Sequence, residues 1–272
     1  MSMFEIFEFE FMRLAFVGGT IIGVLAPTIG IFLVLRRYGL IGDGLGHIAF
    51  GGVAFGQLVK VDPIVMAIAY SVAAALGIEQ LRVRGRLGGD VAIAIFLSSG
   101  LALGLVLARL ARRSTDQLWN YLFGSVIMLQ PRDILQLALI AALVLGVLFV
   151  VRRELFFVTF DEETARASGI RVGAYNILLV MLAALTVVSA IQIVGLLLIS
   201  ALLVLPVAAA LQLARSFRQA LSLAVGSSLL SVYGGLIGSY YLDTQPGPTI
   251  VLAALVLFVL VNLGRSARFR VA

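Results

Sequence analysis

The sequence contains no cysteine, one histidine and one lysine, and only 12% of its 272 residues are charged. Without cysteine, metal sites built from thiolates and structural disulfide bonds are excluded. The lone lysine, Lys60, follows Val59, so the Gly-x-x-x-x-Gly-Lys-Ser/Thr phosphate loop of an ATPase cannot be present. Hydrophobic residues make up 61% of the chain, against about 45–50% in soluble domains. The composition therefore excludes an ordinary soluble domain and predicts a membrane protein.

Hydrophobic runs follow one another along the whole chain, and crossing a bilayer takes about 20 such residues. The candidate spans cover residues 14–35, 43–59, 63–81, 90–110, 133–151, 173–191, 193–213, 219–241 and 249–264. Several are short for a full crossing, so we expect about eight or nine transmembrane helices. A further apolar segment, 118–129, is too short to cross and is expected to be re-entrant or packed at the surface. The predicted fold class is all-α, a polytopic membrane helix bundle that forms a single domain over residues 1–272.

The basic residues fall between the apolar spans and indicate the orientation of the chain. With nine crossings and an outer N-terminus, 14 of the 20 basic residues lie on the inner side. These are Arg36, Arg37, Arg82, Arg84, Arg86, Arg152, Arg153, Arg166, Arg171, Arg215, Arg218, Arg265, Arg268 and Arg270. The opposite orientation would reverse this split, so the C-terminus and the loop 152–172 are predicted to be cytoplasmic. Because the net charge of +6 follows this topological pattern, it implies no nucleic-acid partner.

An acidic residue and the only histidine stand together inside one predicted span. Asp43 and His47 are four residues apart, so on a helix both side chains project from one face, one turn apart. Ionisable groups at membrane depth cost about 2.5–3.5 kcal/mol each and are usually functional. A carboxylate and an imidazole form half of a site for a divalent transition metal. The alternative is a buried hydrogen-bonded pair that locks two helices together.

Pairs of small residues four apart let helix backbones approach closely. One such pair, Gly42 and Gly46, lies one position before Asp43 and His47, which places the acid–imidazole face beside a tightly packed ridge. That placement favours a site that faces protein or a cavity over one that faces lipid. The other pairs are Gly52 with Gly56, Gly100 with Gly104, and Gly234 with Gly238.

The longest charged segment on the predicted inner side is the loop 152–172. Within it, Asp161 suits the N-cap of a short helix, Glu162 and Glu163 suit its first turn, and Gly169 suits its C-cap. The pattern predicts a short surface helix. Two interpretations remain open, a solvated turn between spans and a docking helix for a cytoplasmic partner.

The run LRRYGLIGDGLGHIAFGGVAFG, residues 35–56, resembles the signature of the zinc/manganese/iron permease family of ABC importers. In that signature a basic pair is followed by Gly-Asp-x-x-x-His and a stretch of small residues. Further segments resemble the family in the expected order along nearly the whole chain: LFGSVIMLQPRDIL, FDEETARASGI, IVGLLLISALLVLPVAAA and GSYYLDTQPGPTIVL. The chain departs from the family at Gly44 and Gly46, where alanine or serine is more usual, and this leaves the two ligand positions in place.

The resemblance implies a permease subunit of a prokaryotic cell membrane that forms a homodimer and pairs with two cytoplasmic ATPase subunits. It would receive metal from an extracytoplasmic binding protein, with ATP hydrolysis on the partner chain and no permanently bound cofactor. The implied cargo is Zn²⁺ or Mn²⁺, with iron as a further option. By position, Asp43 and His47 match the metal pathway. The residues that match the ATPase-docking segment are Asp161, Glu162, Glu163, Ala165 and Gly169.

The rival function is that of a stand-alone secondary transporter of metal and protons. In such a protein Asp43 and His47 would relay protons across the membrane. Dependence of transport on an ATPase partner separates the two functions.

Overall fold

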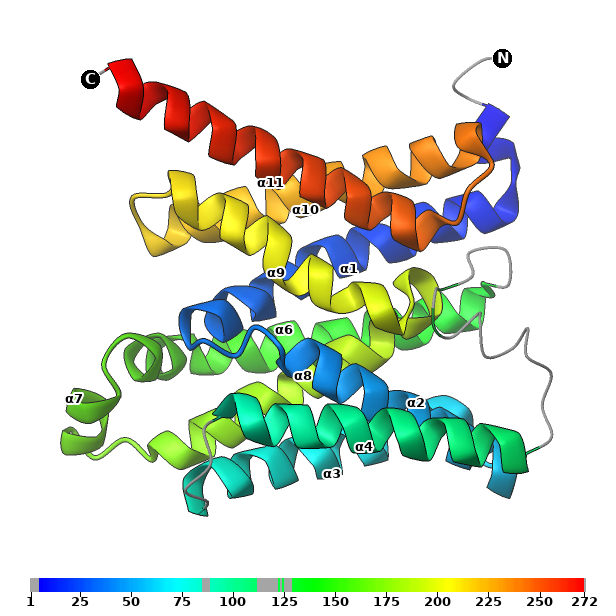
Figure 1. Cartoon of the computed structure of the whole chain (residues 1–272), viewed down its shortest axis with the longest axis horizontal. Coiled ribbons are helices and arrows are strands. Elements are labelled where there is room, and N and C mark those ends of the chain that lie inside the picture. Colours follow the sequence, from blue (N-terminus) through cyan, green and yellow to red (C-terminus); the bar gives the residue numbers. More distant parts are fainter. Residues whose placement is uncertain (1–4, 85–88, 112–121, 123, 125–128, 272) are drawn as a thin grey trace.

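The computed structural model describes residues 5–84, 89–111, 122, 124 and 129–271, and these residues form a helical bundle (Figure 1). The elements are η1 (Glu5–Glu8), α1 (Glu10–Leu35), α2 (Ile41–Val59), α3 (Pro63–Arg84), α4 (Gly89–Leu110), α6 (Pro131–Phe160), α7 (Glu162–Ala167), α8 (Val172–Val194), α9 (Leu196–Leu213), α10 (Phe217–Leu242) and α11 (Pro246–Val271). Helices are the expected outcome because an apolar segment in lipid must satisfy its backbone hydrogen bonds internally. The predicted all-α class is confirmed.

The long helices run roughly side by side and reverse direction from one to the next (Figure 1). Each of the nine predicted spans is matched by one helix of at least 18 residues in the described part of the chain. The N-terminus and the C-terminus lie at opposite ends of the bundle, as an odd number of crossings requires. The short helix α7 projects at the end of the bundle where the C-terminus lies. The predicted segment 118–129 falls almost entirely outside the described residues.

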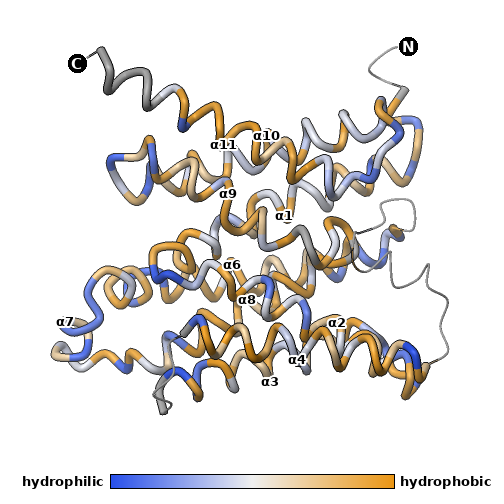
Figure 2. Tube along the Cα trace, in the orientation of Figure 1, coloured by the Kyte–Doolittle hydropathy of each residue, from blue (hydrophilic) through white to orange (hydrophobic). Residues whose placement is uncertain are grey.

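Seven of the described helices are long and apolar enough to cross a membrane by length and composition. The remaining two long helices are special cases. Helix α9 has a shorter apolar stretch, Ile199–Leu213, and α2 carries Asp43 and His47 among its glycines. Figure 2 shows apolar residues along the helices and hydrophilic residues gathered at their ends and on α7. This distribution agrees with an integral membrane protein.

Helix α6 is longer than the sequence predicted. The hydrophobic run ends near residue 151, yet the helix continues to Phe160 and reaches 30 residues. At 1.5 Å per residue its length is about 45 Å, which exceeds the roughly 30 Å hydrocarbon core of a bilayer. The extension RRELFFVTF contains no glycine or proline, so nothing in it interrupts the hydrogen-bond ladder. The first half of the expected loop 152–172 is therefore helical, and only its second half contains the short helix and turns.

Helices α1 and α8 lie in the interior of the bundle, with 67% of their most apolar windows buried, against 17% for α11. Helix α2 packs against α3 and α4 on one side and against α8 and α9 on the other. Glycine permits this approach: a methyl group at Gly100 of α4 would lie 2.8 Å from the backbone nitrogen of Ile48. The predicted glycine contacts are confirmed for three of the four pairs, whereas Gly234 has nothing within 4 Å.

Candidate functional site

Asp43 and His47 lie one turn apart in the first half of α2, and both side chains are half-buried. The Oγ of Ser200, on α9, donates a hydrogen bond of 2.5 Å to Oδ1 of Asp43. Gly42 makes this contact possible because a methyl group there would lie 3.2 Å from Cβ of Ser200 and 2.9 Å from Cδ1 of Leu203. The glycine ridge of α2 thus brings the carboxylate to a hydroxyl on α9.

The imidazole of His47 lacks a partner on one side. Its Nδ1 atom is buried and has no hydrogen-bond partner. A buried polar atom left unpaired costs about 1–3 kcal/mol, so natural proteins keep few of them. The alternative interpretation, a pair that only locks helices, accounts for Asp43 through its bond to α9. It does not account for His47.

Few further ligands surround the pair. Within the described ranges, no group of three or more histidine, aspartate or glutamate side chains could hold a metal ion. The carboxylate, the imidazole and the Ser200 hydroxyl together supply oxygen and nitrogen donors, which suit zinc, manganese and iron alike. Three donors are fewer than the four of a closed zinc site. This set suits brief passage of an ion or a site completed from elsewhere.

The segment predicted to dock an ATPase forms the expected short helix, α7. Asp161 is its N-cap, and Oδ1 of Asp161 accepts a 2.9 Å hydrogen bond from the Thr164 amide. Hydrogen bonds from Thr164 lower the pKa of the Asp161 carboxyl below its ordinary value. Ala165 is fully buried against Val158 and Val172, whereas Glu163 is exposed.

The C-terminal end of α7 differs slightly from the prediction. Ser168 is the C-cap, and Gly169 follows it with a φ of +83°, a left-handed conformation that glycine adopts without strain. A methyl group at Gly169 would meet nothing within 4 Å, so backbone conformation rather than space requires glycine there.

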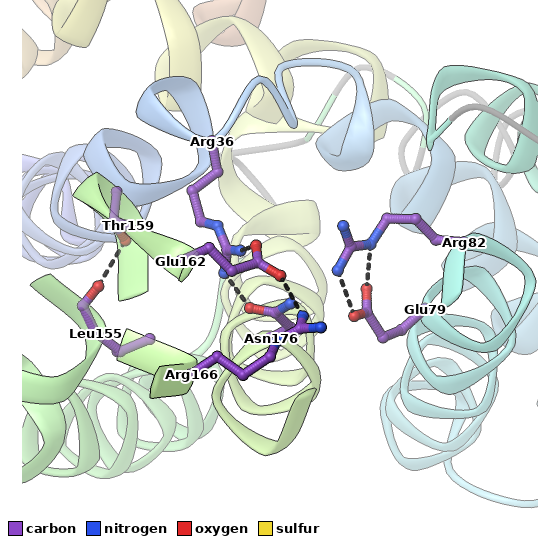
Figure 3. Close-up of polar contacts among 8 residues, drawn as sticks. All are labelled: Arg36, Glu79, Arg82, Leu155, Thr159, Glu162, Arg166 and Asn176. Atoms are coloured by element: carbon purple, nitrogen blue, oxygen red, sulfur yellow. Dashed lines mark hydrogen bonds and ion pairs between the residues drawn. The ribbon is translucent and has the colours of Figure 1, made fainter. Parts of the chain in front are cut away.

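A buried arginine ties α7 to the end of α1 (Figure 3). The Nη2 atom of Arg36 lies 2.8 Å from Oε2 of Glu162, and its Nη1 atom donates a hydrogen bond to Oδ1 of Asn176 on α8. The Arg36 side chain is only 6% exposed, against 37% for Glu162. Arg166 approaches the other carboxylate oxygen of Glu162 at 3.1 Å. One guanidinium therefore holds together α1, α7 and α8.

A second arginine lies on the other side of the loop between α1 and α2. Arg82, at the end of α3, makes bonds of 2.9 and 2.7 Å to the buried carboxylate of Glu79 (Figure 3). The ring of Tyr38 lies between the two arginines, 5.8 Å from the Arg36 guanidinium and 5.4 Å from that of Arg82. Burial raises the pKa of the Tyr38 hydroxyl to about 12.

Sequence reasoning missed Ser200 and assigned Arg36 only a topological role. Ser200 is the one polar side chain in the run GLLLISALLVLP, and a lone hydroxyl among aliphatic residues was the available signal. Arg36 gave no such signal because the arginine pair at 36–37 looks like any positively charged boundary of a span.

Comparisons with known proteins agree with this geometry. A model of the ABC 3 transport family matches residues 8–264. The chain belongs to this family. The predicted family is thus confirmed, and membership decides against a stand-alone secondary transporter.

Individual relatives match over nearly their whole length. The high-affinity zinc uptake system membrane protein ZnuB of Haemophilus influenzae is 32% identical, covering 93% of this chain and 97% of its own. The manganese import system permease protein ScaB of Streptococcus gordonii is 34% identical, covering 93% of this chain and 90% of its own. The structure of PsaBC from Streptococcus pneumoniae in complex with Fab has a TM-score of 0.86 at 31% identity, covering 94% of this chain and 92% of that chain.

Proposed function

We propose that this chain is the membrane-spanning permease of an ATP-driven importer of divalent transition metal ions, zinc or manganese, with iron as a further option. The observation that carries the proposal is the half-buried pair on α2, where Asp43 is paired with Ser200 and Nδ1 of His47 is left without a partner. The zinc uptake and manganese import functions of the relatives support the same cargo. The metal is the substrate, and it passes through the site.

Asp43 and His47 would replace part of the hydration shell of the ion as it crosses. A carboxylate neutralises one positive charge, and a neutral imidazole adds a nitrogen ligand without adding charge. The Ser200 hydroxyl holds the carboxylate in place on the α9 side. Since one copy supplies so few donors, we propose that two copies of the chain assemble, as the resemblance implies, and that the ion is either shared or held only briefly.

The partners follow from the same proposal. A binding protein delivers metal at the outer end, and a cytoplasmic ATPase docks on α7, which presents Asp161 and Glu163 to solvent. The end of the bundle that carries α7 and the C-terminus is then cytoplasmic, in accordance with the excess of arginine there. Arg36 connects the docking helix to α1, and after the five linking residues 36–40 the chain enters α2, whose third residue is Asp43.

Metal uptake into proteoliposomes tests the proposal, with the chain reconstituted together with its ATPase and binding protein. Asp43→Asn keeps an oxygen that accepts the Ser200 bond but loses the charge, and His47→Gln keeps polarity but loses the imidazole. Both variants are expected to lose ATP-dependent uptake of Zn²⁺ or Mn²⁺ while the dimer still assembles. The matched control is Asp90→Asn, because Asp90 is exposed at the start of α4. Wild-type uptake by Asp43→Asn and His47→Gln would show that the pair does not bind the ion during transport.

A Ser200→Ala variant separates the pathway from a helix lock. If Asp43 only locks α2 to α9, Ser200→Ala, which removes the bond, must lower thermal stability and uptake at least as much as Asp43→Asn, which keeps it. If Asp43 binds the ion, Ser200→Ala is expected to keep partial uptake, because the carboxylate remains.

A further inference from the structure

A groove of about 890 Å³ lies beside α1, between α6 and α10. Helix α1 packs against both of the other helices and contributes Thr28 and Phe32 to the lining. The groove lies at the end of the bundle that also carries α7 (Figure 1), where α6 ends and α10 begins.

One end of the groove is strongly basic. Its lining includes Arg152 and Arg153 of α6 and Arg218 of α10, and all three side chains are exposed. In the part of the chain that the structure describes, none of the three forms an ion pair with an acidic side chain. The Arg152 guanidinium stacks 4.3 Å from the centroid of the Phe149 ring, and both side chains line the groove. Three arginines without acidic partners attract an anion.

The rest of the groove is apolar. Leu145, Phe149, Arg152 and Phe156 follow one another at intervals of four, three and four residues, so one face of α6 lines the groove. From Leu145 to Arg152 this face runs about 10 Å along the helix axis. On the opposite wall Phe217 contacts Phe156, with ring centroids 5.1 Å apart. A small soluble anion would contact the arginines but not the apolar face of α6. An amphiphile with an anionic headgroup would contact both.

We propose that the groove between α6 and α10 binds one anionic phospholipid of the cytoplasmic leaflet. The phosphate contacts the arginines, whose planar guanidinium groups suit bidentate bonds to phosphate oxygens. One acyl chain lies along Leu145 and Phe149 toward the middle of the bilayer. The inference rests on the proposed function only for the orientation that makes this end cytoplasmic. Basic pockets between membrane helices on that side are suited to such headgroups.

Retention of phosphatidylglycerol by the purified permease dimer tests this proposal. The dimer is extracted from vesicles that contain phosphatidylcholine and phosphatidylglycerol, and bound lipid is measured by native mass spectrometry. Arg152→Gln together with Arg218→Gln removes one cation from each wall. At about 1 kcal/mol per arginine near the headgroup, the affinity for phosphatidylglycerol should fall roughly thirtyfold. The lysine pair, Arg152→Lys with Arg218→Lys, keeps the charge and should retain most of the affinity.

The matched control is Arg37→Gln with Arg171→Gln, two exposed arginines at the same end of the bundle and outside the groove. This control is expected to retain phosphatidylglycerol as the wild type does. Equal losses in the control and groove variants would overturn the proposal, because they would indicate general attraction to anionic lipid. Displacement of the lipid by inorganic phosphate would also overturn it and assign the site to a soluble anion. A third result would overturn it as well: the groove variant retains the lipid but no longer binds the ATPase. That result would make the groove a protein interface. None of these readouts requires metal transport, so they stand apart from the test of the metal pathway.

Discussion

Truncating Glu162 to alanine should destabilise the chain far more than truncating its neighbour Glu163. Glu162 is the ion-pair partner of Arg36, whose side chain is 6% exposed. In Glu162→Ala the guanidinium stays buried with only the neutral Asn176 oxygen as a partner. Removing one partner of a fully buried pair costs about 3–5 kcal/mol. Because Glu162 is itself 37% exposed and water screens the pair, we expect about 2 kcal/mol.

The substitution Arg36→Met makes the complementary change. It removes the buried charge, leaves Oδ1 of Asn176 without its donor, and frees Glu162 to turn toward solvent and Arg166. The double variant, Glu162→Ala with Arg36→Met, contains neither charge and so leaves no charge unpaired. Its loss of stability should therefore be about 1–2 kcal/mol smaller than the sum of the two single losses. The coupling energy, rather than either single value, measures the interaction.

Unfolding of the purified chain in detergent provides the assay, with Glu163→Ala as the control. Glu163 is exposed, so its truncation should change stability by no more than about 0.5 kcal/mol. The same variants are then tested for metal-stimulated ATP hydrolysis with the ATPase bound, which should fall in Glu162→Ala. Equal stability of Glu162→Ala and Glu163→Ala would refute the role of the buried ion pair.

Two further predictions concern α4 and α7. Gly100→Ala should cost about 1–3 kcal/mol of stability, because the methyl group would meet the Ile48 and His47 backbones at 2.8 and 3.0 Å. Gly146→Ala, with nothing within 4 Å, is its control in thermal unfolding, and equal effects would contradict the close packing. The pKa of Asp161 is lowered, so the ionised carboxylate stabilises the helix cap at neutral pH. This stabilisation is lost as the pH falls through the pKa of Asp161 in the folded chain. Asp161→Asn should remove this acid sensitivity from hydrogen exchange at the Thr164 amide, and an unchanged pH profile would assign the titration elsewhere.

The sequence predicted the helices well because each span leaves a local signal. A run of about 20 apolar residues in lipid must be helical, so the existence and order of the spans needed no knowledge of tertiary contacts. The end of α6 was harder to predict from the sequence. Hydropathy marks where lipid ends, whereas the helix ends only at Phe160, where Asp161 begins a new cap. The end of a hydrophobic run and the end of a helix therefore have different physical causes.

The candidate site was predicted in part for a similar reason. Asp43 and His47 are four residues apart, so their proximity follows from the period of the helix. Ser200 is 157 residues from Asp43, and Glu162 is 126 residues from Arg36, so these contacts arise only when the bundle is packed. Arginines at the ends of spans are frequent for topological reasons, and the sequence offers no means of telling the buried Arg36 from the exposed Arg37 beside it.

The difference between these two neighbouring arginines bears on how a partner on the proposed docking helix α7 would act on the candidate metal site. Arg37 is exposed and has a φ of +62°, so the chain turns sharply there while Arg36 remains fixed to Glu162 and Asn176. Tyr38 then fills the space between the Arg36 and Arg82 guanidinium groups. A displacement of α7 would therefore be resisted at the last turn of α1 and by the end of α3, both of which adjoin the start of α2. Because α2 is one continuous helix from Ile41 to Val59, movement of its first turn would carry Asp43 and His47 together relative to Ser200 on α9. The short connection after α1 is thus the segment through which force on α7 would alter the ligand geometry of the pair.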